Sequence, residues 1–540
     1  MFTGFVNGNI YVSFKPVKKV EALLVANEKI LYAGCNKIVE GVIRLVEGEL
    51  VDLRGRTVLP GFIDSHMHLD ELGMYLNMLD LRGIRSIREL KSRLEEYSRN
   101  FRGKWIVGHG WDHEIFEEKR VPTRYDLDEI VSDKPVMLSR ICMHAAVLNT
   151  KALEDTGLIG MKLPGVIVDE KGVPTGVVKE DAFFSIAKEK FRATLTVEDY
   201  EKYFEDAMNF AASNGVTTVG FALCDMRSWH ALTKLNYRGT FPVRVRVYLH
   251  PGERRPDEGG MYENKDVLDV VKKLGIKRGF GNEFLKLLGI KIVADGGLGA
   301  RTAWLSRPYS DDPMTSGYPN LGEEMLTTLV KEANEAGLQV SVHCIGDRTL
   351  DMALKVFEDI GKLEDGRHRI EHASLLREEQ ADKLSTLNVP VSVQPHFIIT
   401  DWWAKNRVGE DRIKYVWPFK TMIKKGIKIG IGTDCPVEPL NPWETVYAAV
   451  TRGKYDGIPY YEDTKEECLS LEETLYAYTW GSAYIMHEEQ NLGSLEEGKF
   501  ADFIVLDKDP FTLSETQLRN IKVIETYVGG KCVWKKENLV

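Results

Sequence analysis

The feature that most constrains the fold is a regular alternation of strand-like and helix-like segments that begins near residue 195. Short runs rich in aliphatic and β-branched residues recur there, separated by amphipathic helical patterns at 200–213, 323–336 and 377–387. One similar run lies earlier in the chain. The eight predicted strands are residues 61–68, 215–221, 241–249, 287–295, 338–343, 368–372, 389–394 and 427–434. Eight strands in βα order favour an α/β fold, a (β/α)8 TIM barrel.

A doubly wound open sheet is the alternative. Sheets of that class commonly bind nucleotides through a glycine-rich loop between a strand and a helix. The glycine-rich segment here, Gly296-Gly297-Leu298-Gly299, is not followed by the Lys-Ser/Thr of a phosphate loop. The barrel is therefore the more economical interpretation.

Both ends of the chain are rich in short strand-like runs joined by turns, and chain ends often lie close together. We therefore expect residues 1–58 and 490–540 to form one small β-sandwich domain. The barrel would comprise residues 59–80 and 190–489. Residues 81–189 predict an inserted α+β subdomain.

Composition limits the classes of partner. The 540 residues carry a formal net charge of −10 with acidic and basic residues interspersed, so no basic stripe indicates a nucleic-acid partner. No run of about 20 apolar residues predicts a membrane span. Seven dispersed cysteines without CxxC pairs, and an N-terminus without signal-peptide features, favour a cytoplasmic protein. We expect a small-molecule substrate. Whether the chain forms a homo-oligomer is left open by the sequence.

Polar residues stand where the predicted strands end. His66 and His68 are two apart on a strand, so both imidazoles would point to one side, although an isolated pair is also compatible with ordinary buried histidines. Carboxyl ends of barrel strands converge on one face. The residues that would meet there are His66, His68, Lys291, His343, His372 and Asp434. Imidazole and carboxylate ligands suit divalent zinc, iron, manganese or cobalt.

Lys291 is the unusual member, because a buried ammonium among divalent cations is unfavourable. Two interpretations stay open. Lys291 either pairs with a carboxylate such as Asp295, or its amine reacts with CO₂ to form an anionic carbamate that bridges metal ions.

These residues, in this order, resemble the amidohydrolase superfamily. Within it the chain is similar to the amidohydrolase-3, YtcJ-like branch, which includes N-substituted formamide deformylase. The supporting motifs cover nearly the whole chain: GFIDSHMH, GHGWDHE, RICMH, PTGVVKE, IKIVADGGLGARTA, VHCIGD, IEHA, GTDCP and GSLEEGKFAD.

The resemblance implies that His66 and His68 bind the more buried metal, with Asp434 nearby. It implies that His343 and His372 bind a second metal and that a carbamylated Lys291 bridges the two. Lys179, in the motif GVVKE, competes for the bridging role, and some members of the superfamily use a single ion. One or two ions, with zinc favoured, are the expected cofactor.

The expected reaction is hydrolysis of a C–N bond in an amide, formamide or cyclic amide. A bound metal lowers the pKa of water towards about 7 and supplies hydroxide at neutral pH. Asp434 would accept the proton of that water and pass it to the departing nitrogen. The alternatives are an ester, lactone or phosphotriester hydrolase and, from another class, a non-catalytic regulatory relative.

Five further side chains are candidates for substrate binding: Arg301, His396, Trp111, His113 and His144. Arg301 follows the fourth barrel strand and would grip an anionic or carbonyl group, and His396 ends the seventh strand. The other three belong to the predicted insert. For each of them, packing or a structural hydrogen bond is the alternative role.

Overall fold

The computed structural model describes residues 2–141, 145–160, 163–179, 182–252, 264–361 and 367–537. The chain forms two compact units. The first comprises residues 1–70, 204–253 and 260–540, and the second comprises residues 71–203 and 254–259.

Eight parallel strands of the first unit pair in chain order, from β8 to β22. They are β8 (Phe62–Met67), β15 (Val216–Cys224), β16 (Arg244–Leu249), β18 (Leu285–Val293), β19 (Gln339–Cys344), β20 (Arg369–His372), β21 (Val391–Val393) and β22 (Ile429–Ile431). The Asp434 N–H donates to the His66 carbonyl at 2.8 Å, and the His68 N–H donates to the Cys435 carbonyl at 2.8 Å. These bonds join the first strand to the end of the eighth, so the sheet is a nearly closed barrel, which confirms the predicted fold class.

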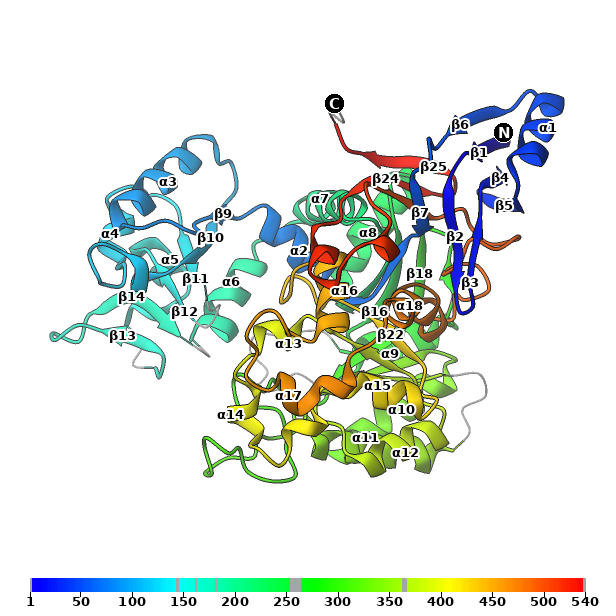
Figure 1. The fold of residues 1–540 in the computed structure, drawn as a ribbon. Helices are drawn as coiled ribbons and strands as arrows, with labels where there is room; N and C mark the ends of the chain where they lie inside the picture. The colour runs from blue at the N-terminus through cyan, green and yellow to red at the C-terminus, as the bar shows by residue number, and fades with distance from the viewer. Residues whose placement is uncertain are drawn as a thin grey trace. The chain divides into compact units, whose positions relative to one another are not determined.

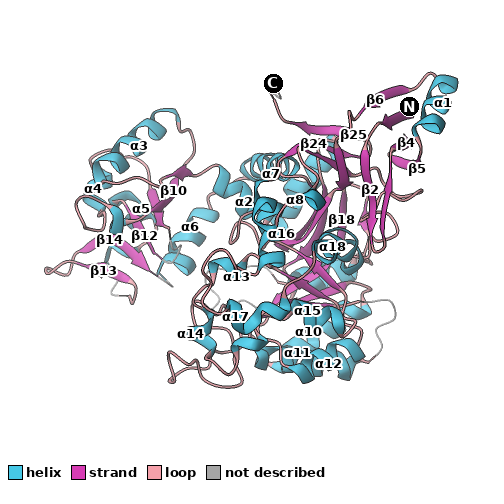
Figure 2. Ribbon diagram, in the orientation of Figure 1, coloured by secondary structure: helices cyan, strands magenta, loops and turns pink. Residues whose placement is uncertain are grey.

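The helices cover the barrel from outside, as Figure 2 shows for α10 (Glu323–Glu335), α11 (Asp347–Ile360) and α12 (Glu378–Thr386). In α10 the buried residues are Leu326, Leu329, Val330 and Ala333, spaced so that they share one face of the helix. Other helices of this unit include α8 (Met226–Arg238), α9 (Asp266–Lys273), α13 (Phe397–Thr400), α14 (Ala404–Val408), α15 (Phe419–Lys424), α16 (Pro442–Thr451), α17 (Tyr461–Thr464), α18 (Leu471–Tyr476) and α19 (Ser482–Ile485).

The two ends of the chain pair with one another. The six-stranded sheet runs β25-β24-β23-β7-β2-β3, so it contains strands from both termini (Figure 1). Its strands are β2 (Asn9–Phe14), β3 (Val17–Val20), β7 (Thr57–Pro60), β23 (Phe503–Leu506), β24 (Val523–Val528) and β25 (Lys531–Lys535). The rings of Phe5, Phe503 and Tyr527 pack together with centroids 4.5–5.3 Å apart. This aromatic contact ties the two termini into one core.

A second, four-stranded sheet lies near the N-terminus, in the order β5-β4-β1-β6. Its strands are β1 (Phe2–Val6), β4 (Ala22–Ala26), β5 (Lys29–Gly34) and β6 (Glu49–Asp52). Helix α1 (Asn36–Val46) packs on this sheet through Val39 and Ile43, next to Gly4. The sequence analysis did not predict this helix, because the pattern at this end of the chain is dominated by short strands.

The second unit is built on a mixed sheet, in the order β13-β14-β12-β11-β10-β9. Its strands are β9 (Leu79–Asp80), β10 (Ile106–Trp111), β11 (Val136–Arg140), β12 (Ala145–Leu148), β13 (Val166–Val168) and β14 (Pro174–Lys179). Its helices include α3 (Ile87–Asn100), α4 (Arg124–Asp128) and α5 (Thr150–Asp155). The predicted insert, residues 81–189, lies within this unit, and the predicted domain boundaries stay predictions.

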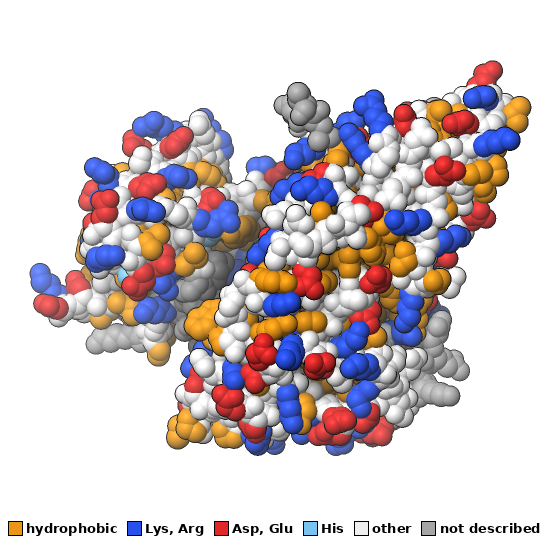
Figure 3. Space-filling view, viewed as in Figure 1, with side chains coloured by type: hydrophobic (Ala, Val, Ile, Leu, Met, Phe, Trp, Pro, Cys, Tyr) orange, Lys and Arg blue, Asp and Glu red, His pale blue; other side chains and the backbone are white. Residues whose placement is uncertain are grey.

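Charged side chains of both signs are interspersed on the face shown in Figure 3. Among the described residues, no helix combines the length and the apolar character needed to cross a membrane.

Candidate metal centre

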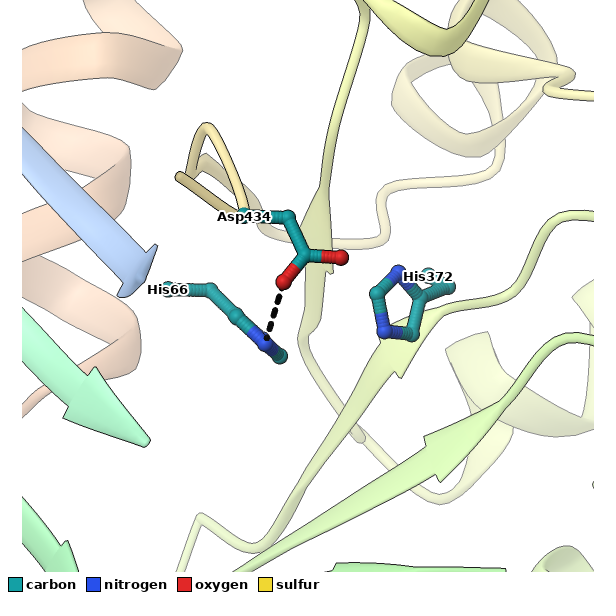
Figure 4. A group of neighbouring side chains, drawn as sticks. All are labelled: His66, His372 and Asp434. Atoms are coloured by element: carbon teal, nitrogen blue, oxygen red, sulfur yellow. Dashed lines mark ion pairs between the residues drawn. The ribbon is translucent and has the colours of Figure 1, made fainter. Parts of the chain in front are cut away.

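Three side chains from different barrel strands meet at the carboxyl end of the sheet. His66 belongs to the end of β8, His372 ends β20, and Asp434 follows β22 (Figure 4). One potential ligand atom from each lies within 4.8 Å of the other two, and all three side chains are buried. Residues more than 300 positions apart thus converge on one point, as expected of the carboxyl face of a barrel.

His68 lies beside this group. Its Nε2 is 3.1 Å from Asp434 Oδ1, and the Nε2 of His66 is 3.4 Å from the same oxygen. Burial would raise the pKa of Asp434, but His66 and His68 outweigh it and hold that pKa well below its usual value. The carboxylate is therefore ionised and faces both imidazoles.

His343, near the end of β19, lies beside His372, and the two ring centroids are 4.4 Å apart. The His343 Nε2 is 3.4 Å from Asp295 Oδ1 and 3.3 Å from the Gly296 carbonyl. Burial lowers the pKa of His343 well below its ordinary value and that of His372 to about 3. Both rings are therefore neutral at physiological pH, the form in which imidazole binds metals.

Lys291 in β18 is buried, and its Nζ has no hydrogen-bond partner among the described residues. No ion pair joins it to Asp295, so that interpretation of the sequence is wrong. Asp295 instead accepts hydrogen bonds from the N–H groups of Ile345, Gly346 and Trp304 and from the Thr349 hydroxyl. Burial lowers the pKa of Lys291 to about 8, so an appreciable fraction of its amine is neutral near pH 8.

Glu371 is a site residue that the sequence analysis missed. Its Oε2 lies 2.5 Å from His66 Nδ1, and its Oε1 accepts from Arg369 Nε and from the Ser341 hydroxyl, both at 2.5 Å. Strands β8 and β20 are not neighbours in the sheet, so the contact with His66 crosses the barrel interior. Arg369 and His66 overcome the effect of burial and hold the pKa of Glu371 well below its ordinary range. An ionised Glu371 therefore fixes the proton of His66 on Nδ1.

This tautomer makes the site suitable for a cation. With a proton on Nδ1, the imidazole of His66 turns its Nε2 towards the Asp434 carboxylate, at 3.4 Å, so a cation between these two groups would be bound by both. The Nδ1 of His372 is also buried without a partner among the described residues. A donor set of imidazoles and one carboxylate fits a divalent transition metal.

Backbone conformation helps to aim two of these side chains. His372 and Asp434 have φ values of 71° and 64°, the left-handed region that non-glycine residues rarely adopt. Such conformations cost about 1–3 kcal/mol each and cluster at functional sites. Strand alternation would place Glu371 in the barrel interior and His372 outside, and the positive φ at His372 turns the chain as the strand ends.

A buried carboxyl group supports the loop that carries Asp434. Asp64 in β8 accepts hydrogen bonds from the N–H groups of His66 and Thr433 and from the Thr433 hydroxyl. Burial raises the pKa of Asp64 to about 6. This residue connects the first strand to the residue that precedes Asp434.

Two of the candidate substrate contacts lie on loops of the barrel unit. The Arg301 guanidinium makes two hydrogen bonds to Asp311, at 3.0 and 3.1 Å, and Arg407 pairs with the same carboxylate. His396 is buried, and its Nδ1 lies against Glu438. Arg301 thus already has an anionic partner, while His396 has one nitrogen engaged.

The other candidates belong to the second unit. Trp111 packs in the core of that unit and its indole N–H donates to the Leu138 carbonyl at 2.7 Å, which is the packing role considered as the alternative. His113 is partly exposed, with Nε2 3.3 Å from Glu114. Lys179 is exposed at the end of β14. His144 lies outside the described residues.

The barrel with a gathered histidine and carboxylate group defines a class of metal-dependent hydrolases, and comparisons with known proteins give the family. The chain matches the amidohydrolase family model Amidohydro_3 over residues 49–534. It is 33% identical over 542 residues to the protein named "Putative amidohydrolase YtcJ" of Bacillus subtilis (strain 168), and the match covers 98% of each chain. It is 25% identical over 546 residues to N-substituted formamide deformylase of Arthrobacter pascens, covering 97% of each chain.

A solved structure shows the same architecture. An uncharacterized metal-dependent hydrolase from Pyrococcus horikoshii OT3 superposes with a TM-score of 0.83 at 42% identity, covering 96% of this chain and 99% of that one. The chain belongs to the amidohydrolase family, as the sequence motifs indicated.

Proposed function

We propose that the protein is a hydrolase that cleaves a C–N bond of a small amide, formamide or cyclic amide with the help of a divalent metal ion. The observation that carries this proposal is the convergence of His66, His372 and Asp434, with ligand atoms within 4.8 Å, at the carboxyl end of the barrel. The names of two relatives, an amidohydrolase and an N-substituted formamide deformylase, support the choice of bond.

In this proposal, His66, His68 and Asp434 hold one metal ion, and His343 and His372 hold a second if two are bound, with zinc the first choice. The metal would polarise the substrate carbonyl and lower the pKa of the attacking water. We assign the role of general base to Asp434, and its ionised carboxylate, buried beside His66 and His68, supports this assignment. It takes the proton of the attacking water on its carboxylate and delivers it to the departing nitrogen.

Lys291 would complete the donor set as a carbamate. Its amine is buried without a hydrogen-bond partner among the described residues, and the charges of Glu371, Asp434 and Arg369 act on its pKa. Reaction with CO₂ requires the neutral amine, which the low pKa provides. Lys179 is the competing candidate, and its exposure argues against a bridging role.

The direct test has two parts: elemental analysis measures the metal content of the protein, and an activity assay compares the turnover of Asp434→Asn with that of wild type. We expect one or two equivalents of bound metal in the wild-type protein. The variant should lose about 100-fold to 10,000-fold in kcat, since a general acid–base contributes that much. Asp359→Asn, on the exposed side of α11, is the matched control and should retain full activity. Unchanged turnover in metal-loaded Asp434→Asn would remove Asp434 from the mechanism.

A substrate panel distinguishes the bond. Secondary formamides, amides and cyclic amides are compared with esters, lactones and phosphotriesters under the same metal loading. Preferential release of amine from the first group supports the proposal. Preference for the second group would be compatible with the proposed metal site but would show that the enzyme cleaves a different bond, because the metal ligands do not determine the leaving group.

A further inference from the structure

The loops after β21 and β22 carry a buried histidine–glutamate pair outside the metal-ligand group. His396 Nδ1 lies within hydrogen-bond distance of Glu438 Oε2, and the Thr400 hydroxyl donates to Glu438 Oε1 at 2.7 Å. His396 is 7% exposed and Glu438 is 4% exposed. The carboxylate is held at both oxygens, so the orientation of the imidazole is fixed.

This arrangement determines which nitrogen of His396 is available. Since a carboxylate only accepts hydrogen bonds, the Nδ1 of His396 carries a proton, and in that tautomer of the imidazole the Nε2 is the hydrogen-bond acceptor. It makes no hydrogen bond within the described parts of the chain. An acceptor that is held in one orientation on a largely buried side chain, and that makes no hydrogen bond inside the described chain, is suited to bind a ligand.

The pair lies next to the candidate metal centre. The ring centroid of Phe397, which follows His396, is 6.5 Å from that of His372. On the other loop, the Val437 N–H donates to the Asp434 carbonyl at 2.9 Å, and Glu438 is the next residue. Each residue of the pair is thus connected through an adjacent residue to the metal-ligand group, to the ring of His372 on one side and to the backbone carbonyl of Asp434 on the other.

The surroundings of His396 favour hydrogen-bond donors over anions. The Glu438 carboxyl group beside the imidazole lone pair would repel a substrate carboxylate and attract an N–H group.

We propose that His396 Nε2 accepts a hydrogen bond from the N–H of the scissile amide or of the amine portion of the substrate, with Glu438 as its positioning residue. This inference rests on the proposed function and narrows it, because the enzyme then prefers secondary formamides and amides to N-methylated tertiary ones. Sites built around a hydrogen bond discriminate strongly against analogues that lack the matching group.

The experiment uses the metal-loaded full chain and two probes that differ by one methyl group, N-cyclohexylformamide and N-cyclohexyl-N-methylformamide. Turnover is measured for wild type, His396→Phe, Glu438→Gln and Thr400→Val. We expect His396→Phe to lose about 10-fold to 100-fold in kcat/KM on the secondary probe and less than about 3-fold on the tertiary one. Glu438→Gln and Thr400→Val should also lower kcat/KM more on the secondary probe than on the tertiary one, but by smaller factors than His396→Phe. The control is His230→Phe on the exposed surface of α8, which should leave both probes unaffected.

Binding gives a readout that does not depend on turnover. Calorimetry should show that wild type binds the secondary probe at least about 10-fold more tightly than the tertiary one, and that His396→Phe abolishes the difference. Equal losses on both probes, equal affinities in wild type, or no detectable binding of either would overturn the inference. Selective binding of the secondary probe without release of formate would instead contradict the proposed function and leave the contact with His396 standing.

Discussion

Two buried cations of the barrel, one towards each end, differ in how they are paired. Towards the amino end of β16, the Arg244 guanidinium makes two hydrogen bonds to Asp502, at 2.7 and 3.0 Å, and Asp502 also accepts from the Gly529 N–H. At the carboxyl end, Lys291 is equally buried, and its Nζ has no partner among the described residues. A fully paired charge has its electrostatic requirements met by the fold, whereas an unpaired one is available for a ligand.

Substitutions at the amino end are therefore expected to change the stability of the fold, and substitutions at the carboxyl end are expected to change metal binding. The largest effect should come from breaking the pair at the amino end. Asp502→Ala leaves Arg244 charged and buried without compensation, which costs about 3–5 kcal/mol in the free energy of unfolding. Denaturant unfolding of the metal-free protein measures this loss, and the metal content of the folded protein should be unchanged.

The matched control replaces both partners. Arg244→Leu combined with Asp502→Leu removes the charges together and should recover most of the lost stability, since hydrophobic replacements of buried pairs are often neutral. If Asp502→Ala lowered metal affinity as strongly as stability, the proposed separation between the two ends would be incorrect.

The second effect concerns the carboxyl end. Glu371→Gln removes the negative charge that keeps the His66 proton on Nδ1, with little change in side-chain shape. We expect metal affinity to fall about 10-fold to 100-fold, as for other carboxylates that hydrogen-bond metal-binding histidines. Competition with a chromophoric chelator measures the affinity without any substrate.

Ser341→Ala is the control for Glu371→Gln. It removes one donor to the other carboxylate oxygen and leaves the charge in place, so its effect on metal affinity should be clearly smaller. Equal effects of the two substitutions would indicate that packing, and not the charge at His66, determines affinity.

The barrel could be predicted because its signal is repeated: eight apolar runs in βα order, all of which are strands of one sheet. The candidate ligands were found because histidine and aspartate at strand ends are conspicuous. Helix α1 was not predicted, since Asn36–Val46 lies among short strands whose pattern dominates that end of the chain.

Glu371 escaped the sequence analysis for a physical reason. It is adjacent to His372, and a single sequence does not reveal that the left-handed backbone at His372 lets both side chains serve the same site. The signal that could have found it is Arg369-Ile370-Glu371, two charged residues at alternate positions of a buried strand. Such spacing indicates a charged pair on one side of the strand. The pairing of Lys291 with Asp295 was wrong because backbone N–H groups of following loops, invisible in the sequence pattern, already satisfy that carboxylate.

The smallest effect should be a change in pH dependence caused by Lys291. Burial lowers the pKa of Lys291 from 10.5 to about 8, so between these values the unfolded chain binds a proton that the folded metal-free protein does not. The contribution of Lys291 to the free energy of unfolding therefore rises as the pH increases from about 8 to 10.5, and it falls again as the pH decreases towards 8 and below. The rise between pH 7 and 9 should be about 1 kcal/mol.

Lys291→Met removes this dependence, so the difference in unfolding free energy between wild type and variant should shrink by that amount from pH 7 to 9. Lys179→Met, at an exposed lysine, should leave the pH profile of wild type unchanged and serves as the control. A pH profile of Lys291→Met parallel to that of wild type would mean that the ammonium has found a counter-charge in solution. Lys291 would then resemble Arg244 at the other end of the barrel, and the case for its neutral amine as the site of carbamate formation would be lost.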